Sequence, residues 1–173
     1  EQAGCIHSYD PTSGKLLETF DTGGRAPHDF YFINKDVICV ANASEPIKNK
    51  SVGVLSWIDV SKNKITQSYK VVEPNHLLSL GGDSVLISSL ITGTEVGEFY
   101  KYNFIEKKIT DSKTSKNYQS YFHNGEKLSL AVITKDLAAV TTATGQKILF
   151  WNHKENKMVT KSFSTPMFGL ATK

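Results

Sequence analysis

The chain has 173 residues, of which 39% are apolar and 21% charged, a balance typical of a folded globular domain rather than a disordered segment. Its 20 basic and 17 acidic residues give a net charge of +3. The lysines are scattered and form no basic stripe, so we expect no nucleic-acid partner. No apolar run reaches the 18 residues of a membrane-spanning helix and no leader peptide is visible, so we expect no membrane span.

The first predicted element is a β-hairpin over residues 5–20. An alternating strand ends at Tyr9 and Asp10, a polar turn follows, and a second strand begins at Leu16. The same pattern recurs over residues 54–69, 98–113 and 147–163. Each copy has an Asp or Asn where its first strand ends, and we predict that this side chain caps the hairpin turn. The four capping residues are Asp10, Asp59, Asn103 and Asn152.

A second recurring unit lies between these hairpins. It consists of a short apolar strand, a turn and a β-rich run, and it occurs over residues 29–42, 76–90 and 128–143. A fourth copy begins at residues 168–171. Both units recur at an interval of about 40–50 residues, which is the period of β-propeller blades.

The sequence therefore predicts an all-β fold, a β-propeller of four-stranded antiparallel blades. We expect a single partial domain of about three and a half to four blades, whereas propellers usually close with about four to eight. Remaining propeller blades, a protein partner or a homodimer would be needed to close the ring. The blade repeats lie near residues 5–53, 54–97, 98–146 and 147–173.

Candidate site residues gather where the first strand of a blade begins, at the expected mouth of the channel. His28 and His76 take equivalent places immediately before this strand, and Arg25 and Asp29 flank His28. An Arg beside His and Asp could hold an anionic ligand. The two His residues are candidate metal ligands, but a metal site needs three or four. The alternative is that His28 and Asp29 only fix the entering loop by hydrogen bonds to the backbone.

Other residues indicate packing rather than chemistry. Cys5 and Cys39 lie in strand patterns and are expected to be buried free thiols. Trp57 and Trp151 are expected to pack between blades. No motif of a nucleophile, a phosphate-binding loop or a metalloenzyme is found, so we favour a protein without enzymatic activity and expect no cofactor.

Several short motifs resemble the bacterial domain-of-unknown-function 1513 family, in the same order along the chain. GGRAPHDFYFINKDVICVAN at residues 23–42 resembles its G-x-G-P-H-E-L followed by L-V-V-A-N, and AAVTTATGQKILFWN at residues 138–152 resembles its A-V-T-S-P-R-G-x-x-V-x-V-W-D. Pro27, His28 and Asp29 stand where the family has P-H-E, with Asp in place of Glu.

This resemblance implies a seven-bladed propeller similar to the amine-dehydrogenase β-chain class. It also implies export to the periplasm, with members often encoded beside imelysin-like iron-uptake components. No activity is established for the family. The family's Ser-Pro-Arg before Gly is Thr142, Ala143 and Thr144 here, so an anion site that used that Arg would be lost.

Three hypotheses of function remain open. The first is a non-enzymatic binding scaffold in the bacterial periplasm near iron uptake. The second is an intracellular, cytoplasmic scaffold of the Trp-Asp-repeat type for protein interactions, although the Gly-His dipeptide of that repeat is missing. The third is a metal- or anion-binding enzyme or redox partner, with Arg25, His28, Asp29 and His76 at the channel mouth.

Overall fold

The computed structural model describes most of the chain as strands and tight turns. The described residues are 4–43, 52–71, 74–79, 84–90, 97–103, 105–106, 108–114, 128–134, 136–142, 147–152, 154–155 and 157–164. They form two compact units, Glu1–Asn75 and His76–Lys173. Within these ranges, no helix is long and apolar enough to cross a membrane. The predicted fourth inner copy at residues 168–171 lies outside the described residues.

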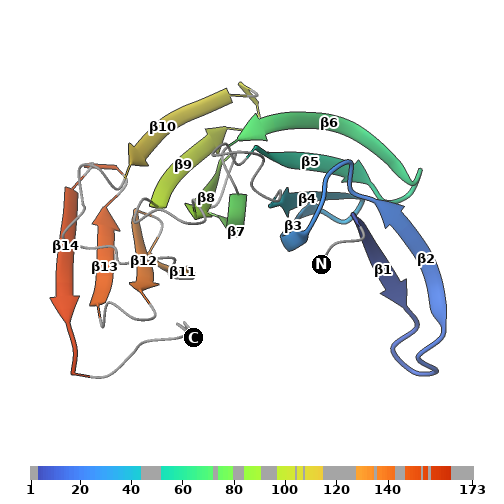
Figure 1. The fold of residues 1–173 in the computed structure, drawn as a ribbon, viewed down its shortest axis with the longest axis horizontal. Helices are drawn as coiled ribbons and strands as arrows, with labels where there is room; N and C mark the ends of the chain where they lie inside the picture. The colour runs from blue at the N-terminus through green and yellow to red at the C-terminus, as the bar shows by residue number, and fades with distance from the viewer. Residues whose placement is uncertain are drawn as a thin grey trace. The chain divides into compact units, whose positions relative to one another are not determined.

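The first unit contains a two-stranded and a four-stranded sheet (Figure 1). The two-stranded sheet, hereafter the first sheet, pairs β1 (Cys5–Tyr9) with β2 (Leu16–Asp21). The four-stranded sheet has the order β3-β4-β5-β6, and every pair in it is antiparallel. Its strands are β3 (Pro27–Asn34), β4 (Val37–Asn42), β5 (Gly53–Asp59) and β6 (Lys64–Val71).

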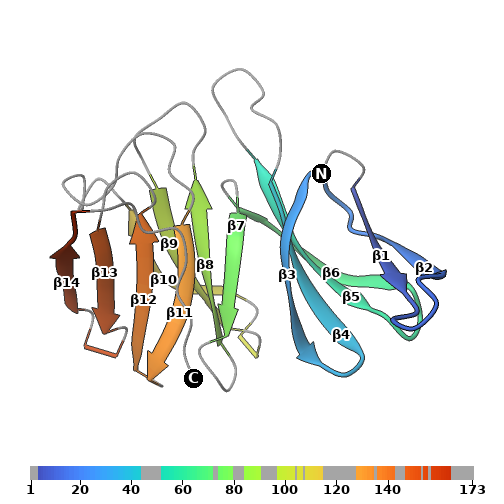
Figure 2. The same cartoon turned by 90° about the horizontal axis from the view of Figure 1, so that it is seen from below.

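The second unit repeats the four-stranded arrangement twice, with neighbouring strands in chain order (Figure 2). One sheet consists of β7 (Pro74–Ser79), which spans the boundary between the units, β8 (Ser84–Leu90), β9 (Gly97–Asn103) and β10 (Lys108–Thr114). The other consists of β11 (Leu128–Thr134), β12 (Leu137–Thr142), β13 (Lys147–Asn152) and β14 (Lys157–Ser162). The prediction of four-stranded antiparallel sheets is confirmed.

The core of the first unit lies between its two sheets. Phe20 of the first sheet packs with Ile38, Val40 and Ile58, and Ile6 lies against this cluster. Cys39 and Ala41, which alternate with Ile38 and Val40 along β4, are also fully buried. Since successive side chains of a strand point to opposite faces, β4 is buried on both faces of its sheet.

The strands differ in burial as the sequence predicts. The outer strand β6 alternates between exposed and partly buried residues, as expected for an edge strand with one face in solvent. Trp57 and Trp151 are buried. Both cysteines are free, but only Cys39 is buried; the expectation for Cys5 was wrong because Cys5 lines a cavity and stays partly exposed.

The capping prediction for the outer hairpins is confirmed in all four copies. The Oδ1 atom of Asp10 accepts hydrogen bonds from the amides two and three residues ahead, at 2.9 and 2.7 Å. Asn103 and Asn152 accept the same two bonds, at 2.8 to 3.1 Å. A carboxylate and a primary amide are therefore interchangeable here, because a single oxygen accepts both bonds.

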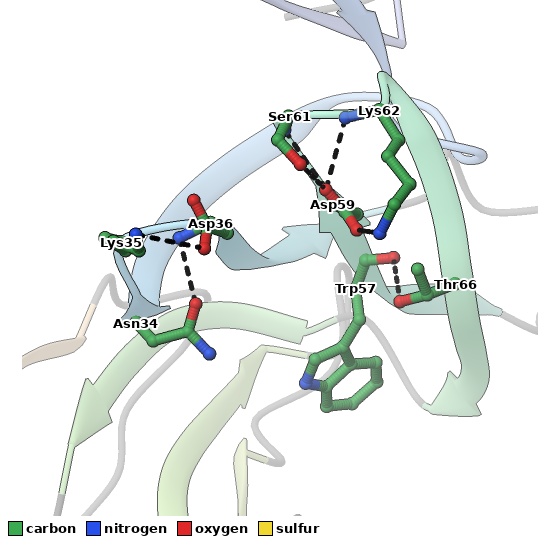
Figure 3. A network of polar contacts seen from close by, with 8 residues as sticks. All are labelled: Asn34, Lys35, Asp36, Trp57, Asp59, Ser61, Lys62 and Thr66. Atoms are coloured by element: carbon green, nitrogen blue, oxygen red, sulfur yellow. Dashed lines mark hydrogen bonds and ion pairs between the residues drawn. The ribbon is translucent and has the colours of Figure 1, made fainter.

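Asp59 makes the most extensive cap of the four (Figure 3). Its Oδ1 accepts the amides of Ser61 and Lys62 and the Ser61 hydroxyl. Its Oδ2 accepts the Lys62 ammonium. The hydrogen bonds from the side chains of Lys62 and then Ser61 lower the pKa of Asp59 from 3.8 to about 2.

The pH dependence of stability should therefore contain a contribution from Asp59. Because the carboxylate is more acidic in the folded chain, its ionised form stabilises the fold above about pH 4, and this stabilisation is lost as the pH falls to about 2. Asp59→Asn should be less stable than the wild type at pH 7 and equal to it near pH 2, as measured by urea unfolding. Lys62→Met, which keeps the backbone bonds of the turn, should remove part of the same pH dependence. Parallel curves for wild type and Asp59→Asn would contradict this assignment.

Candidate functional site

A cavity of about 320 Å³ lies in the first unit between β1 and the beginning of β3. Its lining combines apolar side chains with a thiol, an imidazole and a carboxylate. The lining residues are Cys5, Ile6, Pro27, His28, Asp29 and Phe30. The structure thus brings two of the four predicted site residues, His28 and Asp29, to one cavity.

His28 is placed by an irregularity in the sheet. The pairing of β3 with β4 passes from Pro27 opposite Asn42 directly to Asp29 opposite Ala41, so His28 is an extra residue on β3. Such a bulge redirects a side chain and is common next to binding sites. The prediction that His28 and His76 precede their strands was wrong, because β3 already begins at Pro27 and β7 at Pro74.

Asp29 accepts a backbone hydrogen bond within β3, and the alternative that His28 and Asp29 fix the entering loop stays a prediction. Its Oδ1 accepts a hydrogen bond from the amide of Phe30 at 2.8 Å. Burial raises the pKa of the Cys39 thiol far above its ordinary value, and the negative charge of Asp29 makes a smaller contribution in the same direction. Cys39 is therefore protonated and unreactive at neutral pH.

Of the two other predicted residues, one lies outside the lining of this cavity and the other belongs to the second unit. Arg25 is exposed on the segment between β2 and β3 and is not among the lining residues. His76 is partly buried in β7 and belongs to the second unit. A joint site of His28 and His76 stays a prediction.

An important residue that the sequence did not single out is Asn42, at the end of β4. Its side chain is 1% exposed. Its Nδ2 atom donates to the carbonyls of Thr22 and Val54 at 3.2 and 3.1 Å and lies 3.3 Å from the Ser56 hydroxyl. Asn42 thereby ties the crossing segment, residues 22–26, to the middle strands β4 and β5. No local sequence pattern predicts this role, since the hydrogen-bond partners of Asn42 lie 12 to 20 residues away.

The crossing segment is also attached to the first sheet and fits closely against Asn42. The amide and the hydroxyl of Thr22 both donate to the carbonyl of Gly4, at 2.9 and 2.7 Å. A Cβ atom added at Gly24 would lie 2.5 Å from the Cβ of Asn42, so this position has no room for a side chain. This packing fixes the path by which the chain enters β3 and therefore sets the position of His28 and Asp29.

The metal chemistry of the described part of the chain is limited. Within it, no group of three or more His, Cys, Asp or Glu side chains is arranged to hold a metal ion. The cavity offers an imidazole and a carboxylate as hydrogen-bonding groups beside the apolar walls of Ile6, Pro27 and Phe30. This combination is suited to a ligand with both polar and apolar groups.

Comparison with known proteins supports the fold and leaves the family open. No protein-family model matches the chain, and no curated protein matches it. The chain is similar to the WD40 repeats of RRP9, with 9% identity and a TM-score of 0.63 over 93% of this chain and 46% of that one. It is also similar to the Dos1 propeller, with 12% identity and a TM-score of 0.59 over 94% of this chain and 40% of that one.

A third similar structure is apo AztD from Citrobacter koseri, with 10% identity and a TM-score of 0.53 over 95% of this chain and 58% of that one. The chain spans about half the length of these structures. Together with the observed sheets, these similarities show that the chain has a β-propeller fold. The more specific resemblance to the domain-of-unknown-function 1513 family stays a hypothesis.

Removal of the Asn42 side chain should destabilise the first unit. Asn42→Ala leaves one buried and one partly buried carbonyl without their donor, which we expect to cost about 2 to 4 kcal/mol in the free energy of unfolding. Asn34→Ala is the matched control, because the exposed Asn34 side chain accepts one bond in a turn and should cost below about 1 kcal/mol. Urea unfolding measures both. Equal losses in the two variants would show that Asn42 does not hold the crossing segment.

Metal analysis tests the alternative hypothesis of a metal site at the cavity. A pair of His residues is too small a ligand set for a stable site. We therefore expect purified protein incubated with zinc and then desalted to retain less than one equivalent, with no change in His28→Ala or His76→Ala. Stoichiometric zinc in the wild type that is lost in both variants would establish the metal site.

Proposed function

We propose that this chain is a non-enzymatic scaffold that binds other proteins through β3, the first strand of the four-stranded sheet in its first unit. The observation that carries the proposal is a pair of exposed aromatic side chains on β3, beside the cavity. Phe30 and Phe32 are 48% and 53% exposed. Large apolar side chains that remain accessible next to a pocket mark protein-interaction surfaces.

The two rings extend the core of the first unit. Phe30 lies opposite Val40 and Phe32 opposite Ile38 in the pairing of β3 with β4. Residues directly opposite one another in an antiparallel pair share a face of the sheet. Phe30 and Phe32 therefore lie on the face that carries the buried cluster of Ile38 and Val40. Their rings meet edge to face with centroids 6.0 Å apart, so they present one continuous apolar surface.

The polar groups beside this surface suit a polypeptide ligand. The Asp29 carboxylate and the His28 imidazole both line the cavity. Apolar anchors with a few polar groups at their rim are the usual composition of a protein interface. An enzymatic role stays the alternative hypothesis, because Cys5, His28 and Asp29 bring a thiol, an imidazole and a carboxylate to the same cavity. The Cys5 thiol contacts the imidazole of His7, 3.6 Å from its Nε2 atom.

The cellular setting of the scaffold follows from the sequence resemblance alone. That resemblance supports the bacterial periplasm near iron uptake. The alternative is an intracellular scaffold of the Trp-Asp-repeat type, and the shared propeller fold is compatible with both.

Photo-crosslinking tests the scaffold function at the proposed surface. We expect a benzophenone amino acid at position 32 to form an adduct with another protein in extracts of the source cells. The same probe at position 159, where Val159 is 65% exposed on β14, should form none. The adduct at position 32 should weaken when Phe30→Ser removes the adjacent ring. No adduct, or equal adducts at both positions, would refute binding at this surface.

A further inference from the structure

The first sheet differs from the other described sheets in its number of strands. The hairpin turns capped by Asp10 and Asp59 show that β1 and β2 correspond to β5 and β6, the third and fourth strands of the next sheet. In the three four-stranded sheets, the third strand pairs on its inner side with a second strand. Among the described residues, β1 pairs with β2 alone.

The hydrogen-bonding groups on the inner edge of β1 can be assigned. The carbonyl of Gly4 accepts a hydrogen bond from the amide of Thr22, so the backbone groups of Gly4 point toward β2. Residues of an antiparallel strand alternate in the edge to which their amide and carbonyl point. The backbone groups of Ile6, which lies opposite Phe20, therefore also point toward β2. The backbone groups of Cys5 and His7 point to the inner edge of β1, the edge away from β2.

The surface beside this edge is apolar. The cavity extends from Cys5 and Ile6 on β1 to Phe30 at the beginning of β3. On the face of the four-stranded sheet that meets the first sheet, the residues of β4 and β5 are covered by Phe20 and Ile6. Phe30 and Phe32, on the inner strand of the same face, remain half exposed. Among the described residues, a strand edge without a neighbour and a half-exposed aromatic face thus lie together.

We propose that this place is a docking site for a β-hairpin. Its outer strand pairs antiparallel with β1 through the backbone groups of Cys5 and His7, and its apolar side chains cover Phe30 and Phe32. This is β-strand addition, in which main-chain bonds supply affinity and alternate side chains supply specificity. The inference rests on the proposed scaffold function and gives the chemistry of the partner.

The hairpin belongs to a partner protein, as the proposed scaffold function requires. The described inner hairpin of β3 and β4 takes 16 residues, from Pro27 to Asn42. The strands of the three four-stranded sheets are already paired with one another.

Hydrogen exchange with synthetic hairpins tests the proposal. The probes are peptides with the sequences of residues 27–42, carrying Cys39→Ser, and of residues 128–142, with scrambled peptides as controls. NMR of the labelled 173-residue chain should show that at least one probe slows exchange of the Cys5 and His7 amides. The amides of Ile6 and Ser8, which face β2, should not change.

Two variants of β1 separate edge pairing from side-chain contact. His7→Pro removes an amide that points away from β2, so the first sheet should still form, and circular dichroism checks this. It should weaken binding of the hairpin about tenfold or more, whereas His7→Ala, which keeps the amide, should bind like the wild type. Protection of Cys5 and His7 together with this difference would establish the site.

Three results would overturn the proposal. The first is unchanged exchange at Cys5 and His7 with both probes. The second is equal binding by His7→Pro and His7→Ala. The third is the same protection without any peptide, rising with protein concentration, which would identify a second copy of this chain as the occupant. An adduct from position 32 combined with any of these results would keep the scaffold function and remove only the hairpin.

Discussion

The structure of the first unit depends on the burial of β4 on both faces. Ile38 and Val40 face the first sheet while Cys39 and Ala41 face the opposite side, and all four are at most 3% exposed. A strand of this kind is stable only when both faces of its sheet are covered. The first sheet provides one of these covers with Ile6 and Phe20. Because it has two strands, its cover stops short of β3, which leaves Phe30 and Phe32 accessible.

The repeated architecture could be predicted from the sequence because its chemistry is local. The capping oxygen of Asp10 or Asn152 accepts amides only two and three residues ahead. Any chain that repeats this residue between two alternating strands will repeat the hairpin. The same holds for the alternation of β6, which reflects the two sides of a single strand. The hairpins therefore follow from patterns within about 20 residues, and the four-stranded sheets follow from the repetition of two such units.

The candidate site could be predicted only in part, because its geometry depends on distant contacts. His28 and Asp29 reach one cavity since they are adjacent in sequence. The bulge at His28 arises from its pairing with β4, and no neighbouring residue signals it. Asn42 acts through partners on the crossing segment and on β5, so it appears in the sequence as the end of a strand. Arg25 lies on the crossing segment that leads into β3, but it is exposed there and is not part of the cavity lining.

The two thiols, Cys39 and Cys5, differ in how easily a thiol reagent can reach them. Cys39 has no exposed surface and lies in the middle of the four-stranded sheet, so a thiol reagent can reach it only after that sheet opens. Cys5 is partly exposed in β1 and is accessible without such opening. The ratio of their labelling rates therefore separates loosening at the edge from disruption of the interior, in one experiment on the unmodified protein.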